Sequence, residues 1–381
     1  MIICEKDKCS ACGLCIEICP QNVIQLKLDA FGFYYPEIDE AGCIECGQCK
    51  LSCPQNLHDT TNSILKTYTG YSTDCDLLKN STSGGIIGAL YQKILEQGGY
   101  VAGVKWDNVK SCSFFLTNVE KETREFHGSK YIGAKTQKIY NKVKDKLNAN
   151  FPVIFVGTPC QCAALRSYLK RDYEQLLVVD FVCHGVSSSL VLERYIDLLE
   201  KENDKVRCYL MRSKEKGYSS KTEKIIYYGE KSLIEPFYQS VFGYPFAANL
   251  SVREGCLQCK YASTNRVSDI TVGDWMVGLS EEEEQKGVSL VVVNTEKGSE
   301  IVQEISEEKR VVLKTIPCET AIRCCYRLSH KSDVPKYRGR FLSELKENKK
   351  DIKKLTRYYM RKNNLTIIQL CWKLKRLVIK N

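Results

Sequence analysis

The sequence predicts a protein of mixed class: a small α+β domain, a larger mixed α/β domain, and a basic helical tail. Three observations predict it. Cysteines are concentrated in the first 53 residues, strand and helix patterns alternate from residue 67 onward, and positive charge collects near the end. The expected boundaries are 1–57 for the first domain, 67–150 and 151–330 for the two parts of the larger domain, and 331–381 for the tail.

The first domain contains two identical rows of four cysteines, each spaced C-x2-C-x2-C-x3-C and each followed by proline. The rows are Cys9, Cys12, Cys15 and Cys19, and Cys43, Cys46, Cys49 and Cys53. This spacing is typical of a pair of [4Fe–4S] clusters, in which the fourth cysteine of each row ligates the other cluster. Zinc knuckles and a disulfide framework are the alternatives, but zinc sites usually take four ligands in two spaced pairs. We therefore expect a ferredoxin-like 2[4Fe–4S] domain.

Composition and charge favour a reducing compartment and argue against a nucleic-acid surface. The chain has 21 cysteines, no apolar export signal before the first row, and no apolar run near the roughly 18 residues of a membrane span. Residues 1–56 carry four basic and eight acidic side chains, whereas residues 331–381 carry 16 and four. The net charge of +10 therefore lies mainly in the tail. We expect a cytoplasmic protein with no nucleic-acid partner.

Hydrophobic patterning and turn residues predict the elements in order. The expected elements are a strand or hairpin within 22–38, a helix after the glycine pair at 84–85, a strand over 100–106, strands over 153–156 and 176–182, helices over 161–169 and 187–202, and a strand over 268–272. The strand–helix–strand–helix order at 153–202 implies parallel strands joined by a crossover. The serines at 187–189 are interpreted as helix caps.

Two single cysteines follow the parallel strands, and a C-x2-C pair comes later in the chain. Cys160 and Cys183 lie at the carboxyl ends of their strands, so they should approach each other at the edge where α/β folds bind ligands. Cys256 and Cys259 form the later pair. Four thiolates suit zinc or a third [4Fe–4S] cluster, and their spacing leaves zinc, a cluster and no site as alternatives.

A glycine-rich turn at 81–85 opens the helix that follows it. The start of a helix presents unpaired N–H groups, which suit a phosphate or another anion. Glycine pairs at helix starts are more often turn chemistry than ligand sites, so this motif alone does not establish a binding site.

Six motifs carry a family resemblance: STSGGIIGAL at 81–90, GSKY at 128–131, GTPCQ at 157–161, DFVCHG at 180–185, GCLQCKY at 255–261 and DITVGDW at 269–275. Over roughly residues 1–320 the chain resembles the beta subunit of the coenzyme F420-reducing hydrogenases and dehydrogenases, with a ferredoxin domain in front. The resemblance implies a flavin-binding α/β domain that holds FAD, with a [4Fe–4S] cluster beside it.

Carried over by position, the resemblance names site residues but no catalytic residue. The third cluster's ligands would be Cys160, Cys183, Cys256 and Cys259. The flavin contacts would be Ser83, Gly84, Gly85, Ser129, Lys130 and Tyr131, with the helix start facing the FAD pyrophosphate and Lys130 adding positive charge. The remaining cysteines are interpreted as buried small residues: Cys4, Cys75, Cys112, Cys162, Cys208, Cys318, Cys324, Cys325 and Cys371.

These patterns predict an iron–sulfur flavoprotein oxidoreductase that passes electrons between [4Fe–4S] clusters and FAD. Its substrate would be a small organic molecule, coenzyme F420-like or another acceptor. The alternatives are a non-catalytic electron-transfer subunit feeding a partner enzyme, and a binding protein with structural zinc and no flavin. A redox partner protein and a homo-oligomer are both compatible with the sequence.

The end of the tail, residues 365–380, reads as a helix with a wide apolar face beside strong positive charge. Two interpretations follow: the helix packs back on the larger domain, or it makes peripheral contact with a partner or with the inner face of an anionic membrane.

Overall fold

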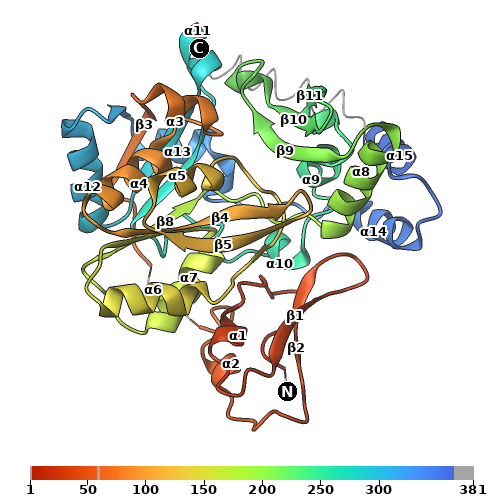
Figure 1. The fold of residues 1–381 in the computed structure, drawn as a ribbon, viewed down its shortest axis with the longest axis horizontal. Helices are drawn as coiled ribbons and strands as arrows, with labels where there is room; N and C mark the ends of the chain where they lie inside the picture. Colours follow the sequence, from red (N-terminus) through yellow and green to blue (C-terminus); the bar gives the residue numbers. More distant parts are fainter. Residues whose placement is uncertain (1, 58–60, 364–381) are drawn as a thin grey trace.

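The computed structural model describes residues 2–57 and 61–363, whose strands form three β-sheets (Figure 1). The largest sheet has nine strands in the order β14 (Val311–Thr315), β3 (Lys66–Ser72), β13 (Val288–Val293), β12 (Ile270–Trp275), β8 (Leu176–Phe181), β7 (Val153–Gly157), β4 (Tyr100–Asn108), β5 (Ser111–Thr117) and β6 (Ala134–Lys135). Strands β4, β7, β8 and β12 are parallel neighbours at its centre. All four strands predicted for the larger domain lie in this sheet.

Helices cover both faces of the main sheet, and β7 shows why. Because successive side chains of a strand point to opposite faces, a strand buried on both faces is apolar throughout. Ile154 and Val156 join the core under α4 (Ile86–Glu96) and α12 (Glu296–Glu307). Val153 and Phe155 join the core under α6 (Ile139–Asn148) and α7 (Pro159–Leu169). The predicted mixed α/β class is thus confirmed.

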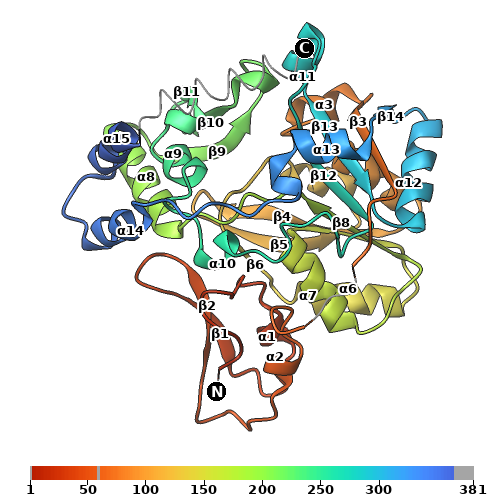
Figure 2. The same cartoon turned by 180° about the vertical axis from the view of Figure 1, so that it is seen from behind.

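A second, three-stranded sheet stands beside the main one. It consists of β9 (Val206–Ser213), β10 (Thr222–Tyr227) and β11 (Ser232–Pro236), and it shares a core with α8 (Ser189–Glu202), α9 (Gly243–Ala247), α14 (Arg338–Glu347) and α15 (Ile352–Lys362). In Figures 1 and 2, α14 and α15 lie against α8. The described part of the predicted tail therefore packs on this core, while the predicted helix at 365–380 lies outside the described residues.

The cysteine-rich domain is built around a hairpin and two single-turn helices. Strands β1 (Ile24–Leu28) and β2 (Tyr34–Ile38) pair antiparallel, as predicted for 22–38. Helices α1 (Leu14–Glu17) and α2 (Gln48–Leu51) each begin after a glycine in the left-handed region. Both views place this domain below the main sheet, beside α6, α7 and α10 (Glu254–Leu257) (Figure 2).

The rest of the chain holds the cysteine-rich domain largely by its main-chain oxygens. Tyr140 donates its hydroxyl to the Cys12 carbonyl at 2.6 Å, and Ser167 donates to the Ser52 carbonyl at 2.7 Å. Further carbonyls of this domain accept from the larger domain: Cys9 and Tyr34 from Arg253, Pro54 and Leu57 from Lys260, Phe31 from Ser188, and Gly32 from the Ser189 amide.

The serines before α8 do not cap it. Ser188 stands at the N-cap position, but no side chain caps the helix. The Ser188 hydroxyl instead donates to the Phe31 carbonyl at 2.6 Å, and the Ser187 and Ser251 hydroxyls bond each other at 2.7 Å. The capping prediction was wrong: the Ser188 side chain bonds the docked hairpin and accepts no hydrogen bond from the first turn of α8.

Five short helices complete the larger domain: α3 (Cys75–Asn80), α5 (Glu120–Thr123), α11 (Glu281–Lys286), α13 (Cys318–Cys324) and the single turn α10. Within residues 2–57 and 61–363, no helix has the length and apolar character needed to cross a bilayer.

Candidate redox site

The first cysteine row lies at the interface between the two domains. Burial raises the pKa of the Cys12 thiol well above its ordinary value, and the nearby Cys15, Cys160 and Cys53 thiols raise it further. Burial likewise raises the pKa of Cys15 to about 12, with Cys9 and Cys53 adding to the effect. Cys53, the last residue of the second row, therefore lies among the first three cysteines of the first row. That is the interleaved arrangement by which two clusters exchange their fourth ligands.

The first part of the second row, residues 43–48, is exposed or half-buried. Burial raises the pKa of the Cys49 thiol, and the nearby Cys19 and Cys46 thiols raise it further, so Cys19 lies with the second row. Cys46 is exposed. A cysteine outside both rows, Cys4, also borders the first group, because the nearby Cys53 and Cys9 thiols raise its pKa. The only sequence signal for this location is that Cys4 precedes the first row by five residues.

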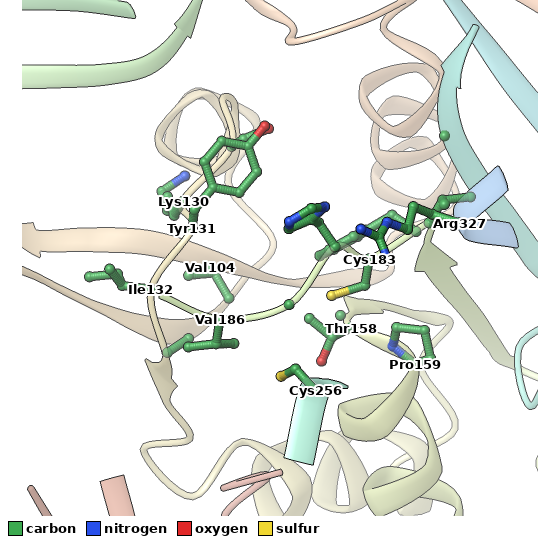
Figure 3. Close-up of a pocket in the computed structure, with 18 of the residues that line it drawn as sticks. Val104, Lys130, Tyr131, Ile132, Thr158, Pro159, Cys183, Val186, Cys256 and Arg327 are labelled. Atoms are coloured by element: carbon green, nitrogen blue, oxygen red, sulfur yellow. The ribbon is translucent and has the colours of Figure 1, made fainter. Parts of the chain in front are cut away.

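The third set of thiols gathers at the carboxyl edge of the main sheet. Strands β7 and β8 pair in parallel with Gly157 opposite Asp180, so their ends meet at the same edge. Cys160 lies in the first turn of α7, and Cys183 follows β8 by two residues. Helix α10 brings Cys256 to them. Figure 3 shows Cys183 and Cys256 on either side of Thr158, whose hydroxyl lies 3.1 Å from the Cys160 sulfur.

Electrostatics link all four members of this set. Burial raises the pKa of Cys256 to about 12, and the Cys160 and Cys259 thiols raise it further. Burial raises the pKa of Cys183 as well, with further contributions from Cys256, Cys160 and Cys259. Buried thiols with raised pKa values become thiolates when a metal centre supplies positive charge. In the described chain, no three His, Cys, Asp or Glu side chains form a group that could hold a single metal ion.

One cavity of about 640 Å³ joins the third thiol set to the predicted flavin segments. Its lining includes all four cysteines of that set, the start of α4, the segment 126–135 and every residue of the turn at 81–85 except Gly84. This volume lies within the range of small-molecule and cofactor sites. The cavity therefore places room for a small molecule directly beside the thiols.

Thr82 and Ser129 bring together two segments that the sequence separates by 47 residues. The Ser129 amide donates to the Thr82 hydroxyl oxygen at 3.0 Å, and the two hydroxyls lie 3.1 Å apart. This contact fixes the turn before α4 against the loop that carries Lys130 and Tyr131.

Within the turn itself, two predicted contacts are engaged with β13. The Ser83 hydroxyl donates to the Val288 carbonyl at 2.6 Å, and the Gly84 amide donates to the Ser289 hydroxyl at 2.9 Å. A Cβ on Gly84 would lie 2.3 Å from the Gly70 carbonyl oxygen, so packing against the sheet explains this glycine. Gly85 has φ 78°, and α4 after it has no side-chain cap. Its first-turn N–H groups are the donors that the turn leaves to the cavity.

Lys130 and Tyr131 both line the cavity (Figure 3). The Lys130 ammonium donates to three carbonyls, those of Phe126, His127 and Gly128, at 3.1–3.3 Å. Burial lowers the Lys130 pKa to about 8. The Tyr131 ring stacks on Phe246 with centroids 4.6 Å apart.

The structure adds cavity residues that the sequence patterns did not assign. Arg212 pairs with Asp274 at 3.0 Å, and its side chain is 7% exposed. His127 lines the cavity with neither ring nitrogen bonded within the described chain, and burial lowers its pKa to about 4. Asp274 belongs to a motif noted above, but no local pattern marks Arg212, whose partner is 62 residues away.

The leftover cysteines only partly fit the prediction of buried small residues. Cys112 and Cys162 are buried, but Cys75 is exposed, and Cys324 and Cys325 are half-buried in the cavity wall. Cys75 is the first residue of α3 and is exposed on the surface of the described chain. Cys371 lies outside the described residues.

Comparison with known proteins supports the family resemblance. Residues 152–319 match the family of the C-terminal part of the coenzyme F420 hydrogenase/dehydrogenase beta subunit, and residues 8–57 match the 4Fe-4S dicluster domain. No curated protein matches the chain. A chain of the F420-reducing [NiFe] hydrogenase complex from Methanosarcina barkeri, solved in a xenon-derivatised form, is similar in fold. It is 17% identical, covers 72% of this chain and 92% of its own, and has a TM-score of 0.50.

Proposed function

We propose that this chain is an iron–sulfur flavoprotein oxidoreductase, because residues 152–319 match the C-terminal part of the coenzyme F420 hydrogenase/dehydrogenase beta subunit and residues 8–57 match a 4Fe-4S dicluster domain. It would pass electrons between three [4Fe–4S] clusters and FAD, and reduce or oxidise a small organic substrate such as a deazaflavin. The similarity in fold to a chain of a hydrogenase complex favours a protein that works with partner proteins.

One observation carries the proposal: the four thiols of the third set and the turn before α4 line the same cavity. A cluster held by these thiols would lie beside any cofactor in that cavity. The dicluster domain lies next to the third thiol set, because Cys12 of its first row and Cys160 of the third set are close enough to interact electrostatically. The three thiol groups thus follow one another from the exposed second row to the cavity.

The cavity fits FAD in three respects. Its volume suits a cofactor, the uncapped start of α4 offers N–H groups to a pyrophosphate, and His127 contributes buried ring nitrogens that have no partner in the described chain. Ser129, Lys130 and Tyr131 would lie along the opposite wall. Bound clusters supply single electrons, and a bound flavin exchanges one or two.

The chain's own residues would do the remaining work. Thr82 and Ser129 fix the two walls of the cavity, and the Arg212–Asp274 pair places a polar group on its lining. The stacked Tyr131 and Phe246 rings would form an apolar part of the cavity lining.

Metal and sulfide analysis tests the three clusters. Anaerobically purified protein should contain about twelve iron atoms and as many labile sulfides per chain. Cys160→Ser should lower both counts by about four and leave the signals of the dicluster domain in place. A wild-type content near eight irons with one zinc would overturn the third cluster and leave the dicluster domain standing.

The flavin is tested by changing the contact that joins the cavity walls. Thr82→Val keeps the shape of the side chain but removes the hydroxyl that accepts from Ser129, so FAD per chain should fall severalfold with iron unchanged. Thr73→Val is the matched control, because its hydroxyl bonds the Lys309 carbonyl at 2.8 Å away from the cavity. FAD is measured by its absorbance after the clusters are bleached. No flavin in wild-type protein would defeat this part of the proposal.

Turnover by the isolated chain separates an enzyme from an electron-transfer subunit. We expect steady reduction of a deazaflavin or another flavin-reactive acceptor with a chemical electron donor. Cluster reduction without turnover of any acceptor would instead support the electron-transfer subunit.

A further inference from the structure

We propose that Arg253 is the shared counter-charge of two iron–sulfur sites, the first cysteine row and the third thiol set, and that it raises the reduction potential of both. The inference rests on the proposed function, because it assumes that both thiol groups hold clusters. It goes beyond that function by assigning a potential-setting role to one side chain.

Arg253 connects the two thiol groups directly. It stands at the N-cap of α10, the helix that carries Cys256, and its amide donates to the Val186 carbonyl at 2.9 Å. Its side chain reaches into the cysteine-rich domain, where Nη1 donates to the Cys9 carbonyl at 3.1 Å and Nη2 donates to the Tyr34 carbonyl. One residue thus joins the main chains that carry a member of each thiol group.

The neighbouring Gly255 shows how closely these main chains approach. A Cβ on Gly255 would lie 2.7 Å from the Cys9 carbonyl oxygen and 3.1 Å from that of Lys8. Only glycine fits between α10 and the first cysteine row without a shift of the backbone. Arg253 is therefore buried in a close contact between the two groups.

Among the described residues, the positive charge of Arg253 has no carboxylate partner. The side chain is 2% exposed, yet in residues 2–57 and 61–363 it pairs with no carboxylate, and its buried Nε has no acceptor there. It lies over the Tyr35 ring at 4.5 Å. By contrast, buried Arg266 pairs with Asp180 at 3.3 Å, and Arg212 pairs with Asp274. A buried and unpaired charge is strongly unfavourable, so an anion is expected beside Arg253.

The flanking thiol groups are where that anion would form. Four thiolates around a [4Fe–4S] core give a net negative charge, which grows by one on reduction. The Arg253 guanidinium donates to the Cys9 carbonyl, and its main chain begins the helix that carries Cys256, so the charge lies close to both groups.

A nearby cation stabilises the reduced, more negative state of a cluster more than its oxidised state. Removing the charge of Arg253 should therefore lower the potentials of the first-row and third-set clusters together. The described hydrogen bonds of the Arg253 guanidinium go to Cys9 and Tyr34 and to no residue of the second row, so the second-row cluster serves as an internal reference.

The test uses the full-length holoprotein and two variants, Arg253→Gln and Arg253→Lys, in redox titrations followed by electron paramagnetic resonance. Signals are assigned with Cys12→Ser, Cys46→Ser and Cys160→Ser. In R253Q the reduction equilibrium constant of the first-row and third-set clusters should fall about tenfold, which equals about 59 mV for a one-electron couple. The second-row cluster should stay unchanged. R253K keeps the charge and should stay within about threefold of wild type at every site.

Iron content is measured on every sample, so that loss of a cluster is not mistaken for a change of potential. Arg310→Gln, which removes a surface arginine paired with Glu96, is a charge-loss control and should leave all three potentials unchanged. Unchanged potentials in an R253Q protein that keeps about twelve irons would overturn the inference and leave the proposed function intact. If R253Q loses iron, the potentials of R253K are used instead. A tenfold fall of the reduction equilibrium constant in R253K, which keeps the charge, would show that packing rather than charge is responsible. Fewer than three clusters in wild-type protein would instead defeat the proposed function.

Discussion

The two cysteine rows share one spacing but lie in opposite surroundings. Leu14 in the first row and Gln48 in the second row occupy equivalent positions. Leu14 is 1% exposed and packs in the core under α6 and α7, whereas Gln48 is exposed. The second row instead presents Ile44 and Leu51 to solvent, at 60% and 72% exposure. The shared spacing serves the clusters, whereas the residues between the cysteines decide which row docks on the larger domain. One row is built as an internal contact and the other as an outer face.

The largest expected difference concerns the lability of the clusters. The second-row cluster should lose iron to a chelator under air about tenfold faster than the first-row cluster, because Cys46 is exposed while Cys9 and Cys53 are buried. Iron release and the two resonance signals are followed over time. Equal rates would show that docking does not shield the first row.

The next difference is in stability. Leu14→Ala should lower the free energy of unfolding by about 2–4 kcal/mol, because it opens a cavity under α6 and α7. Gln48→Ala at the equivalent position should change it by less than about 0.5 kcal/mol. Denaturant unfolding of the holoproteins under anaerobic conditions measures both. A matching loss in the two variants would contradict the asymmetry.

A finer comparison uses the two glycines that begin α1 and α2. Both have positive φ, so alanine at either place should cost about 1–2 kcal/mol. A Cβ on Gly13 would also lie 2.5 Å from Thr136 of the larger domain, whereas a Cβ on Gly47 would meet no atom within 4 Å. Gly13→Ala should therefore cost about 1–3 kcal/mol more than Gly47→Ala. Thermal unfolding of the two variants gives the difference, and Gly13→Ala with Thr136→Ser should recover part of it.

The smallest expected effect is at the outer face. Ile44→Ser and Leu51→Ser should each change the free energy of unfolding by less than about 0.5 kcal/mol, since neither side chain is covered. The same denaturant assay checks this. A loss above about 1 kcal/mol would reveal a packing role for these side chains within the chain.

The cysteine spacing and the strand patterns allowed much of the fold to be predicted. The hairpin between the rows, the strands β4, β7, β8 and β12, and the parallel order of β7 and β8 follow from local patterns. The sheet β9–β11 was not predicted, because its pairing between β9 and β10 shifts register and blurs the alternation. Its strands also face a core supplied by distant helices.

For the site, the sequence allowed the thiols to be predicted but not their neighbours. Cysteine is rare enough for its spacing to be informative, and the sheet edge then relates Cys160 to Cys183. Arg253, Arg212 and the Thr82–Ser129 contact depend on tertiary neighbours 47 or more residues away, and no local pattern marks them. The inward hydrogen bonds of Lys130 likewise depend on a loop conformation that composition does not specify.

The larger domain binds the cysteine-rich domain mainly through main-chain carbonyls, and this affects which substitutions the cysteine-rich domain can accept. Tyr140, Ser167, Arg253 and Lys260 all bond carbonyls of that domain, and every residue type carries a carbonyl. Substitutions on its outer face would leave these bonds intact. The charge and shape of the outer face could therefore change to suit a different electron carrier, and the hydrogen bonds between the two domains would remain.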